Sequence, residues 1–295
     1  VWGIQLFVFG LFKKAIIADN FSRVVDAGFG SFDSMTSGDI ICVMLCYTFQ
    51  IYFDFSGYSD MATGICRMMN IELPMNFDSP YKSVSIRDFW KRWHLTLTRF
   101  LTKYVYFPLG GSRNGTVRTC INVMIVFALS GLWHGANWTF ILWGLINGAL
   151  SVLERLLEKY YNRLSTGLQW MYSFTTVNIL WFLFRSDSIT MWARGMGHLL
   201  KFENMNVSDF IIDAFYVKEN DFIYTILGLG NVYQNVHGFT MITSILIALI
   251  ICLGFENNYR RQWKSSVVTM IVTPFMLLWS LLSLSSEAVF IYFNF

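Results

Sequence analysis

Six long apolar stretches recur along this chain, and short polar or charged segments separate them. Each stretch approaches the roughly 20 residues that an α-helix needs to cross the hydrocarbon core of a bilayer. They lie at about residues 39–60, 118–134, 137–153, 168–185, 238–254 and 266–285. Their length and low charge together predict an all-α fold, a polytopic transmembrane helical bundle.

The N-terminal sequence divides into two parts. Residues 1–18 are apolar but contain Lys13 and Lys14, which predicts the end of one span followed by an interfacial helix. Residues 19–39 are small and polar, and they predict a loop. The chain does not begin with methionine or with the basic start of a signal peptide. We therefore expect one domain over residues 1–295 from which the first helices are missing.

Residues 86–104 have a different pattern, in which apolar and basic side chains occupy opposite faces of one predicted helix. Ser85 and Asp88 match a capping box at its start, and His94 lies on the border between the faces. Such a helix lies at the membrane surface or tilts into a protein cavity. The basic residues that we consider here are Arg87, Lys91, Arg92, Arg99 and Lys103.

The basic face of this helix has two interpretations. It could anchor the helix to anionic lipid, which is the simpler hypothesis for the helix pattern alone. It could instead form a basic cytoplasmic mouth that binds a polyanionic ligand. Gly110 and Gly111, in the turn that follows, would allow the backbone to approach a ligand closely, although a glycine pair alone is weak support.

The composition supports a membrane protein. Hydrophobic residues make up 55% of the chain and charged residues 14%, whereas an ordinary soluble domain has about 25% charged residues. The net charge of +3 does not indicate nucleic-acid binding. The five cysteines form no C-x-x-C pair, which favours small core residues over a disulfide framework or a zinc site.

The distribution of charge predicts an orientation, because Arg and Lys gather on the cytoplasmic side of a membrane protein. Residues 67–118 contain nine basic and three acidic residues, so we expect them inside. Residues 186–237 contain three basic and six acidic residues, so we expect them outside. The other inside turns carry Arg155, Lys159 and Arg163, and then Arg260, Arg261 and Lys264.

His134 lies in an apolar stretch, where a titratable ring is by default a functional-site hypothesis. Gly131, Gly135 and Asn137 predict a bent or broken helix there, and broken backbone at membrane depth lines cavities. The alternative is a structural histidine that forms hydrogen bonds between helices. A neutral imidazole could act as a general base, because its ordinary pKa of about 6.5 lies near working pH.

The sequence gives weaker evidence for a functional role of the other polar residues. His198 and His237 lie in or near the predicted outer segment, and we expect them to be structural or solvated. Asp54 and Asp60 stand at the end of a span, where they either belong to a polar network for a ligand or hold neighbouring helices together. The sequence contains no G-x-S-x-G, P-loop, H-E-x-x-H or Rossmann motif.

Four motifs taken together resemble the membrane-bound O-acyltransferases. They are QIYFDFSGYSDMA at residues 50–62, NFDSPY at 76–81, RDFWKRWH at 87–94 and GLWHGA at 131–136. Within this family the chain most resembles the branch of alginate O-acetyltransferase and its exopolysaccharide and peptidoglycan relatives. The FKK run at 12–14 and the FIYFNF run at 290–295 add to that likeness.

The resemblance implies a helical bundle with interfacial helices around a central tunnel, in the cell membrane. It also implies transfer of an acetyl or other acyl group from a cytoplasmic thioester to a hydroxyl outside. His134 matches the buried family histidine and His94 the second one. The implied donor is acetyl-CoA, a substrate, with no bound cofactor or metal, and its phosphates would lie near some of Arg87, Lys91, Arg92, Arg99 and Lys103.

The acceptor stays open between alginate, cellulose, another exopolysaccharide, peptidoglycan and a carrier protein, reached through an extracytoplasmic partner acyltransferase as the family implies. Two rival classes also remain. A transporter or flippase for a polysaccharide precursor would equally place polar residues inside a bundle. A structural scaffold for polysaccharide export would tolerate the loss of both histidines.

Overall fold

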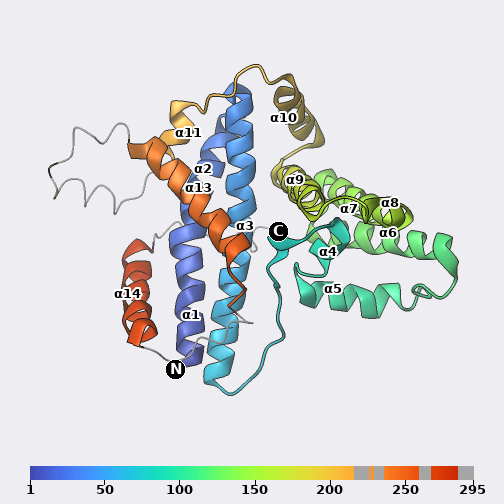
Figure 1. Cartoon of the computed structure of the whole chain (residues 1–295), viewed down its shortest axis with the longest axis horizontal. Helices are drawn as coiled ribbons and strands as arrows, with labels where there is room; N and C mark the ends of the chain where they lie inside the picture. Colours follow the sequence, from blue (N-terminus) through green and yellow to red (C-terminus); the bar gives the residue numbers. More distant parts are fainter. Residues whose placement is uncertain (216–225, 227, 229–235, 259–266, 285–295) are drawn as a thin grey trace. The chain divides into compact units, whose positions relative to one another are not determined.

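The computed structural model describes residues 1–215, 226, 228, 236–258 and 267–284, and every regular element within them is a helix (Figure 1). The prediction of an all-α fold is therefore confirmed. The described residues pack as two compact units. The first contains residues 1–73 and the described residues from 194 onward, and the second contains residues 74–193. That residues 1–295 form one domain stays a prediction.

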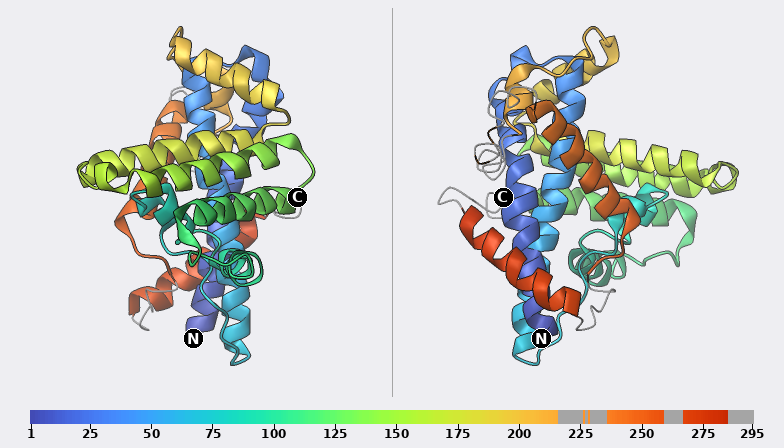
Figure 2. Two further views of the ribbon diagram at one scale, coloured as in Figure 1. Left: turned by 90° about the vertical axis from the view of Figure 1, so that its right-hand side faces the viewer. Right: turned by 60° about the vertical axis from the view of Figure 1, so that its left-hand side comes forward.

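The first unit is built on two long helices. Its elements are α1 (Trp2–Phe12), the π-helix η1 (Lys13–Ala18), α2 (Asp19–Gly30), the 3-10 helix η2 (Phe32–Ser34), α3 (Ser37–Met68), α11 (Asp209–Asp213), α13 (Val236–Gly254) and α14 (Val267–Ser283). Helices α1 and α3 run side by side (Figure 2). Glycines let their backbones touch: a Cβ on Gly10 would lie 2.5 Å from the carbonyl oxygen of Gly57, and one on Gly64 would lie 2.6 Å from that of Gly3.

Two ion pairs join η1 to α3. The Lys14 ammonium lies 2.7 Å from the Asp54 carboxylate, and the Lys13 ammonium lies 2.7 Å from the Asp60 carboxylate. Asn258 also donates to Asp60, over 2.9 Å. Asp54 and Asp60 thus hold neighbouring helices together, which is one of the two alternatives that the sequence left open.

The predicted loop over residues 19–39 is wrong for most of its length, because α2 occupies residues 19–30. Phe21, Val24, Val25 and Gly28 are buried and recur at helical spacing, so the segment is amphipathic rather than simply polar. Only the turn around η2 separates α2 from α3. A capping box between Thr36 and Asp39 begins α3.

The second unit carries both motif histidines. Its elements are the 3-10 helix η3 (Pro80–Lys82), α4 (Ile86–Trp90), α5 (Leu95–Leu101), the π-helix η4 (Thr102–Tyr106), α6 (Gly115–His134), α7 (Trp138–Leu156), α8 (Glu158–Tyr161) and α9 (Thr166–Arg185), and α10 (Ile189–Lys201) crosses the boundary into the first unit. Helices α6 and α7 form an antiparallel pair in which Gly131 and Gly144 face the opposite backbone.

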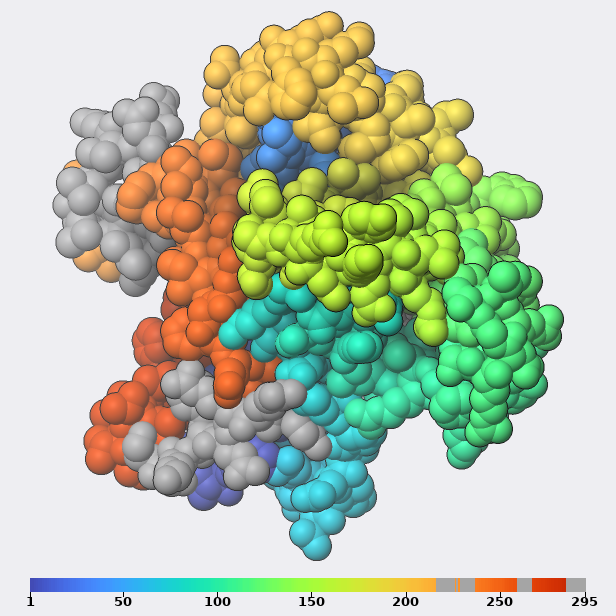
Figure 3. Space-filling view, turned by 45° about the vertical axis from the view of Figure 1, so that its right-hand side comes forward, coloured from blue at the N-terminus to red at the C-terminus, as the bar shows by residue number. Residues whose placement is uncertain are grey.

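The stretch before α4 lies against α9, as the teal and yellow-green surfaces of Figure 3 show. The Trp170 indole donates to the carbonyl oxygen of Tyr81 over 3.0 Å, and the hydroxyls of Ser83 and Ser173 lie 3.0 Å apart. These contacts fix the entry to the segment that carries His94.

All six predicted spans are helical in the structure, as α3, α6, α7, α9, α13 and α14. Among the described residues, four helices are long and apolar enough to cross a membrane: Ser37–Met68, Gly115–His134, Trp138–Leu156 and His237–Gly254. Helix α14 is apolar but shorter. The chain is therefore a multi-pass helical membrane protein.

The prediction of one amphipathic helix over residues 86–104 is wrong in detail. Helix α4 ends at Trp90, residues 91–94 form a turn, and α5 begins at Leu95. His94 has φ 45° and ψ 54°, a left-handed conformation that stops a right-handed helix.

Candidate active site

His94 is held at its bend by a dense set of hydrogen bonds. Its side chain is buried, with 8% of the residue exposed, and its carbonyl oxygen accepts the N–H of Thr98 in the first turn of α5. The Nδ1 atom lies 3.1 Å from the Oδ1 of Asn76 and 3.3 Å from the hydroxyl of Thr96. The ring therefore has a fixed orientation.

Asn76 organises this set from a segment 18 residues earlier in the chain. Its Oδ1 accepts the backbone N–H of Thr96 over 3.2 Å and the Thr96 hydroxyl over 2.8 Å. Its backbone carbonyl accepts the N–H of Leu95 over 2.9 Å. Asn76 thus clamps the first turn of α5 with both its side chain and its main chain.

His134 is the last residue of α6, and the helix stops there because Gly135 adopts φ 150°. A Cβ at Gly135 would lie 2.9 Å from the Phe140 ring, so this conformation and this space both require glycine. The predicted break in the helix near His134 is confirmed. It places the ring at the turn between α6 and α7.

Aromatic rings surround His134. Its ring centroid lies 4.9 Å from that of Trp133, 5.4 Å from that of Trp143 and 5.1 Å from that of Phe184. Rings at these distances and near-perpendicular angles make favourable edge-to-face contacts. The imidazole is half-buried in an apolar setting that three different helical segments supply.

Trp133 connects the two histidines. Its ring lies 6.0 Å from the His94 ring as well as 4.9 Å from the His134 ring, between centroids. Burial, and in second place the electrostatic effect of His134, lowers the pKa of His94 to about 3. His94 is therefore neutral at physiological pH. The structure brings together the two histidines that the sequence singled out.

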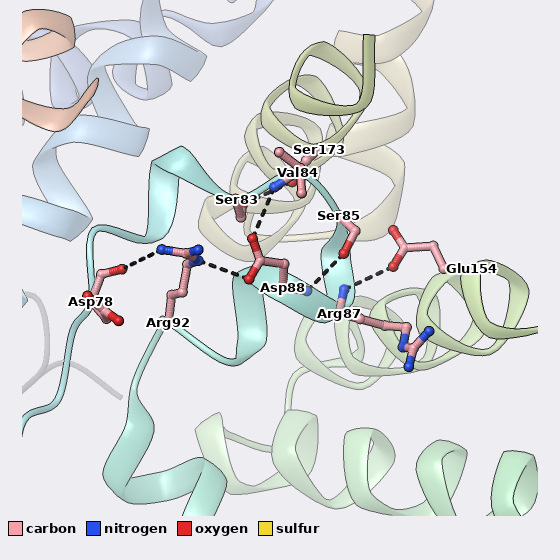
Figure 4. Close-up of polar contacts among 9 residues, drawn as sticks. All are labelled: Asp78, Ser83, Val84, Ser85, Arg87, Asp88, Arg92, Glu154 and Ser173. Carbon is pink, nitrogen blue, oxygen red and sulfur yellow. Dashed lines mark hydrogen bonds and ion pairs between the residues drawn. The ribbon is translucent and has the colours of Figure 1, made fainter. Parts of the chain in front are cut away.

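Contacts with α7 determine where α4 lies (Figure 4). The Glu154 carboxylate accepts the backbone N–H groups of Ile86 and Arg87 over 2.7 and 3.0 Å, and the Ser85 hydroxyl accepts that of Asp88 over 2.9 Å. These acceptors satisfy donors that the start of a helix leaves without partners. The capping role predicted for Ser85 is confirmed, and the Glu154 cap was not predicted.

The far end of α4 is fixed to the same helix. The Trp90 indole donates to the Oδ1 of Asn147 over 3.0 Å, and its ring lies 5.5 Å from the Trp143 ring. Because Trp143 also contacts His134, one face of α7 orders both α4 and the ring at the end of α6.

A cavity of about 260 Å³ opens between α4, α5, η4, α6 and α7. Its wall is largely apolar, and three basic residues, Arg87, Lys91 and Arg155, line it. Ser130 also lines it, one helical turn before His134 on α6. Such a cavity combines room for an apolar chain with positive charge for an anion.

The five predicted basic ligands occupy different surroundings. Arg87 and Lys91 line the cavity. The guanidinium of Arg92 instead pairs with the Asp88 carboxylate over 2.9 Å and donates to the Asp78 carbonyl oxygen (Figure 4). Arg99 and Lys103 are exposed and do not line it.

Arg155 lines the cavity without having been predicted as a ligand. The sequence contained one signal for it, since Arg155 follows a predicted span on the side assigned to the cytoplasm. No sequence spacing relates it to Arg87, because α7 and α4 meet only in the folded unit.

The remaining histidines belong to the first unit. His198 accepts a hydrogen bond from Ser37 at its carbonyl oxygen over 2.8 Å, and the His237 Nδ1 lies 2.9 Å from the Asp213 carboxylate. Among the described residues, no group of three or more His, Cys, Asp or Glu side chains could hold a metal ion. Arg260, Arg261, Lys264 and the run at 290–295 lie outside the described residues.

The sequence was compared with known proteins. The family model of the membrane-bound O-acyltransferases matches residues 2–192. A peptidoglycan O-acetyltransferase of Helicobacter pylori is 36% identical, over 99% of this chain and 56% of the relative. A probable alginate O-acetylase of Pseudomonas putida is 34% identical, over 99% of this chain and 61% of the relative.

A more distant match is a teichoic acid D-alanyltransferase of Streptococcus thermophilus, which is 36% identical over 36% of this chain and 27% of the relative. The chain spans rather more than half the length of the Helicobacter and Pseudomonas relatives, although almost all of the chain is matched.

Proposed function

Because this chain belongs to the membrane-bound O-acyltransferase family, we propose that its protein transfers an acyl group, acetyl in the first instance, from a thioester donor to a hydroxyl acceptor. The observation that carries this proposal is the pairing of His94 and His134 about Trp133, close to a basic cavity. Two imidazoles in an apolar setting suit proton transfer, and the cavity suits an anionic donor with an apolar arm.

The proposed donor is acetyl-CoA, which enters from the cytoplasmic side. Arg87, Lys91 and Arg155 bind its phosphates through charge-assisted hydrogen bonds. The apolar wall accommodates the chain that carries the thioester. Ser130 lines the cavity and lies one turn before His134 on the same face of α6. The exposed Arg99 and Lys103 contribute through longer-range attraction.

In the proposed reaction, His134 takes the proton of the acceptor hydroxyl as its oxygen attacks the thioester carbonyl. A carbon–oxygen bond forms, the carbon–sulfur bond breaks, and the thiolate receives the proton from the imidazolium. The products are an ester and free CoA. His94 either positions the donor or polarises the carbonyl.

The proposed acceptor is a hydroxyl of a cell-envelope polymer on the opposite side of the cell membrane. The names of the relatives support this class, since they include peptidoglycan and alginate. An extracytoplasmic partner acyltransferase completes delivery to the polymer. The protein requires passage from both aqueous sides to the histidines, as in a tunnel through the bundle.

The test uses the full-length protein purified in detergent or nanodiscs, with labelled acetyl-CoA and a polysaccharide that carries free hydroxyls. We expect release of free thiol and labelled ester with wild type, and a loss of roughly 10²–10⁴-fold in rate for His134→Ala. Arg155→Ala should raise KM for acetyl-CoA more than it lowers kcat, because binding to the phosphates is the same in the ground and transition states. Near-normal transfer by His134→Ala would refute the assignment of the base.

The same assay separates transfer from transport. A flippase for a polysaccharide precursor would move a ligand across the vesicle without consuming acetyl-CoA. A scaffold would keep its effect on polymer acetylation in cells after both histidines are replaced. Family membership favours acyl transfer over these alternatives.

A further inference from the structure

The protonation state of His94 follows from the atoms around it. The backbone N–H of Thr96 can only donate, so the Asn76 atom that faces it over 3.2 Å must be the oxygen and not the amide nitrogen. That same oxygen faces the Nδ1 of His94 over 3.1 Å. Two acceptors cannot share a hydrogen bond, so Nδ1 carries the hydrogen.

The Thr96 hydroxyl leads to the same result. It lies 2.8 Å from the Asn76 Oδ1 and donates its one hydrogen there. Its oxygen, 3.3 Å from the His94 Nδ1, is left to accept from the ring. The Asn76 Oδ1 and the Thr96 hydroxyl oxygen are therefore both acceptors toward Nδ1. A neutral ring with its hydrogen on Nδ1 has a lone pair on Nε2.

We propose that Asn76 is a positioning residue that holds His94 in the Nδ1–H tautomer, so that Nε2 of His94 can accept a hydrogen bond from the reacting groups but cannot donate one. This inference rests on the proposed function and narrows it. A neutral ring in this tautomer has no hydrogen on Nε2 with which to polarise a thioester carbonyl. Of the two roles proposed for His94, this leaves positioning, through a hydrogen bond that Nε2 accepts, while His134 remains the base.

In catalytic triads, a third group that holds the far nitrogen of an imidazole likewise fixes the tautomer and the orientation of the ring. Burial keeps His94 neutral, because it lowers the pKa of the ring to about 3. The titratable group that acts on it from the packed helix α6 is His134. On its own segment, Arg92 is paired with Asp88, and Lys91 is exposed and lines the cavity.

Nitrogen-15 NMR of the full-length protein, labelled at histidine, reads the tautomer directly and without activity. The His94 signals are assigned by comparison with His94→Gln. At pH 7 we expect a protonated Nδ1 and an unprotonated Nε2, which is the minor form of free neutral imidazole. The opposite tautomer, or a doubly protonated ring, would overturn the proposal.

Substitution of Asn76 tests whether the tautomer matters. Asn76→Leu removes the acceptor, and we expect kcat to fall by roughly 10- to 100-fold, with KM for acetyl-CoA unchanged and with Nε2 becoming protonated. Asn76→Asp keeps an acceptor oxygen, so we expect it to retain the Nδ1–H tautomer and to recover most of the activity at pH 8. Its carboxylate should also raise the pKa of His94 in the NMR titration.

Asn114→Leu and Asn114→Asp are matched controls at an exposed position in the same unit, and we expect both to behave as wild type. A kcat of Asn76→Leu equal to that of wild type would overturn the positioning role. If Asn76→Leu does not fold, the wild-type NMR spectrum still tests the tautomer, and the activity of Asn76→Asp still tests the positioning role. If wild type shows the Nδ1–H tautomer but transfers no acyl group, the proposed function fails while the tautomer assignment stands.

Discussion

At the scale of single residues, the site depends on two backbone conformations that ordinary side chains avoid. His94 is left-handed at φ 45°, and Gly135 extends to φ 150° directly after His134. The first interrupts the helical segment at His94, and the second ends α6 at His134. The strain at His94 persists only where the surroundings over-determine it, as the hydrogen bonds of Asn76 do here.

Gly135→Ala should displace His134. The added methyl meets the Phe140 ring at 2.9 Å, and the backbone conformation itself is costly for alanine, so we expect a loss of roughly 1–3 kcal/mol in the free energy of unfolding. Thermal unfolding and thiol release measure the two effects. Gly167→Ala is the control, because a Cβ there meets nothing within 4 Å. Equal behaviour of the two variants would contradict this account of Gly135.

The sequence contained enough to select both histidines, since each lies in a dense motif of aromatic and polar residues. It could not assign Asn76, Glu154 or Arg155 to the site. Their partners lie 18 to 68 residues away, and the contacts exist only after α5 and α7 pack. Spacing along a chain predicts neighbours within one helix, but it does not pair residues of different helices.

At the scale of elements, the five-residue helix α4 depends on α7 for its position. An isolated helix of this length is unstable in water, because nucleation costs more than one turn returns. Glu154 at its start and Asn147 at its end supply what its own sequence cannot. Since α4 also carries Arg87, the position of a cavity residue depends on Glu154.

Glu154→Ala should therefore affect stability and donor binding together. It leaves a buried and a half-buried N–H group, those of Ile86 and Arg87, without the carboxylate acceptor, which costs roughly 2–4 kcal/mol in the free energy of unfolding. It should also raise KM for acetyl-CoA by releasing Arg87. Glu158→Ala removes only an exposed partner of Arg87 at 3.5 Å, so we expect it to cost less than about 1 kcal/mol. Similar melting temperatures for the two variants would refute the capping role.

The ion pair between η1 and α3 allows a second element-scale prediction. Lys14→Met should cost about 3–5 kcal/mol in the free energy of unfolding, because it removes the ammonium that lies 2.7 Å from the buried Asp54 carboxylate and 2.8 Å from the Asp19 carboxylate. Adding Asp54→Leu should restore part of that loss. A double-mutant cycle on thermal unfolding measures the coupling. If the double variant is less stable than Lys14→Met alone, the pair is not the cause.

The sequence predicted the long apolar helices well. The six apolar spans became helices because length and apolarity alone decide for a chain in lipid. Two predictions failed where the environment changes within a few residues. Helix α2 has one buried face despite its polar composition, and the helix over 86–104 breaks because tertiary contacts at His94 outweigh its periodicity.

At the scale of the whole molecule, the buried His94 couples stability to pH. The pKa of the ring is about 3 in the folded protein and about 6.5 in an unfolded chain. Between these values the unfolded state binds more protons, so the free energy of unfolding falls as pH drops from 6.5 toward 3.

We expect this one group to contribute up to about 1.4 kcal/mol per pH unit in that window. Thermal unfolding from pH 7 to pH 4 should thus show a steeper decline for wild type than for His94→Gln. Parallel curves for the two proteins would mean that His94 is already protonated, or equally solvated, in the folded state.

The glycines of α1 and α3 fix the register of these two helices against each other. Gly3 and Gly10 are seven residues apart, as are Gly57 and Gly64, and each meets the carbonyl oxygen of its opposite number. A slide of one residue would drive a side chain into that oxygen. Thinning or thickening of the surrounding lipid therefore cannot shift one helix along the other, and the pair must respond to bilayer thickness as a single body, by tilting.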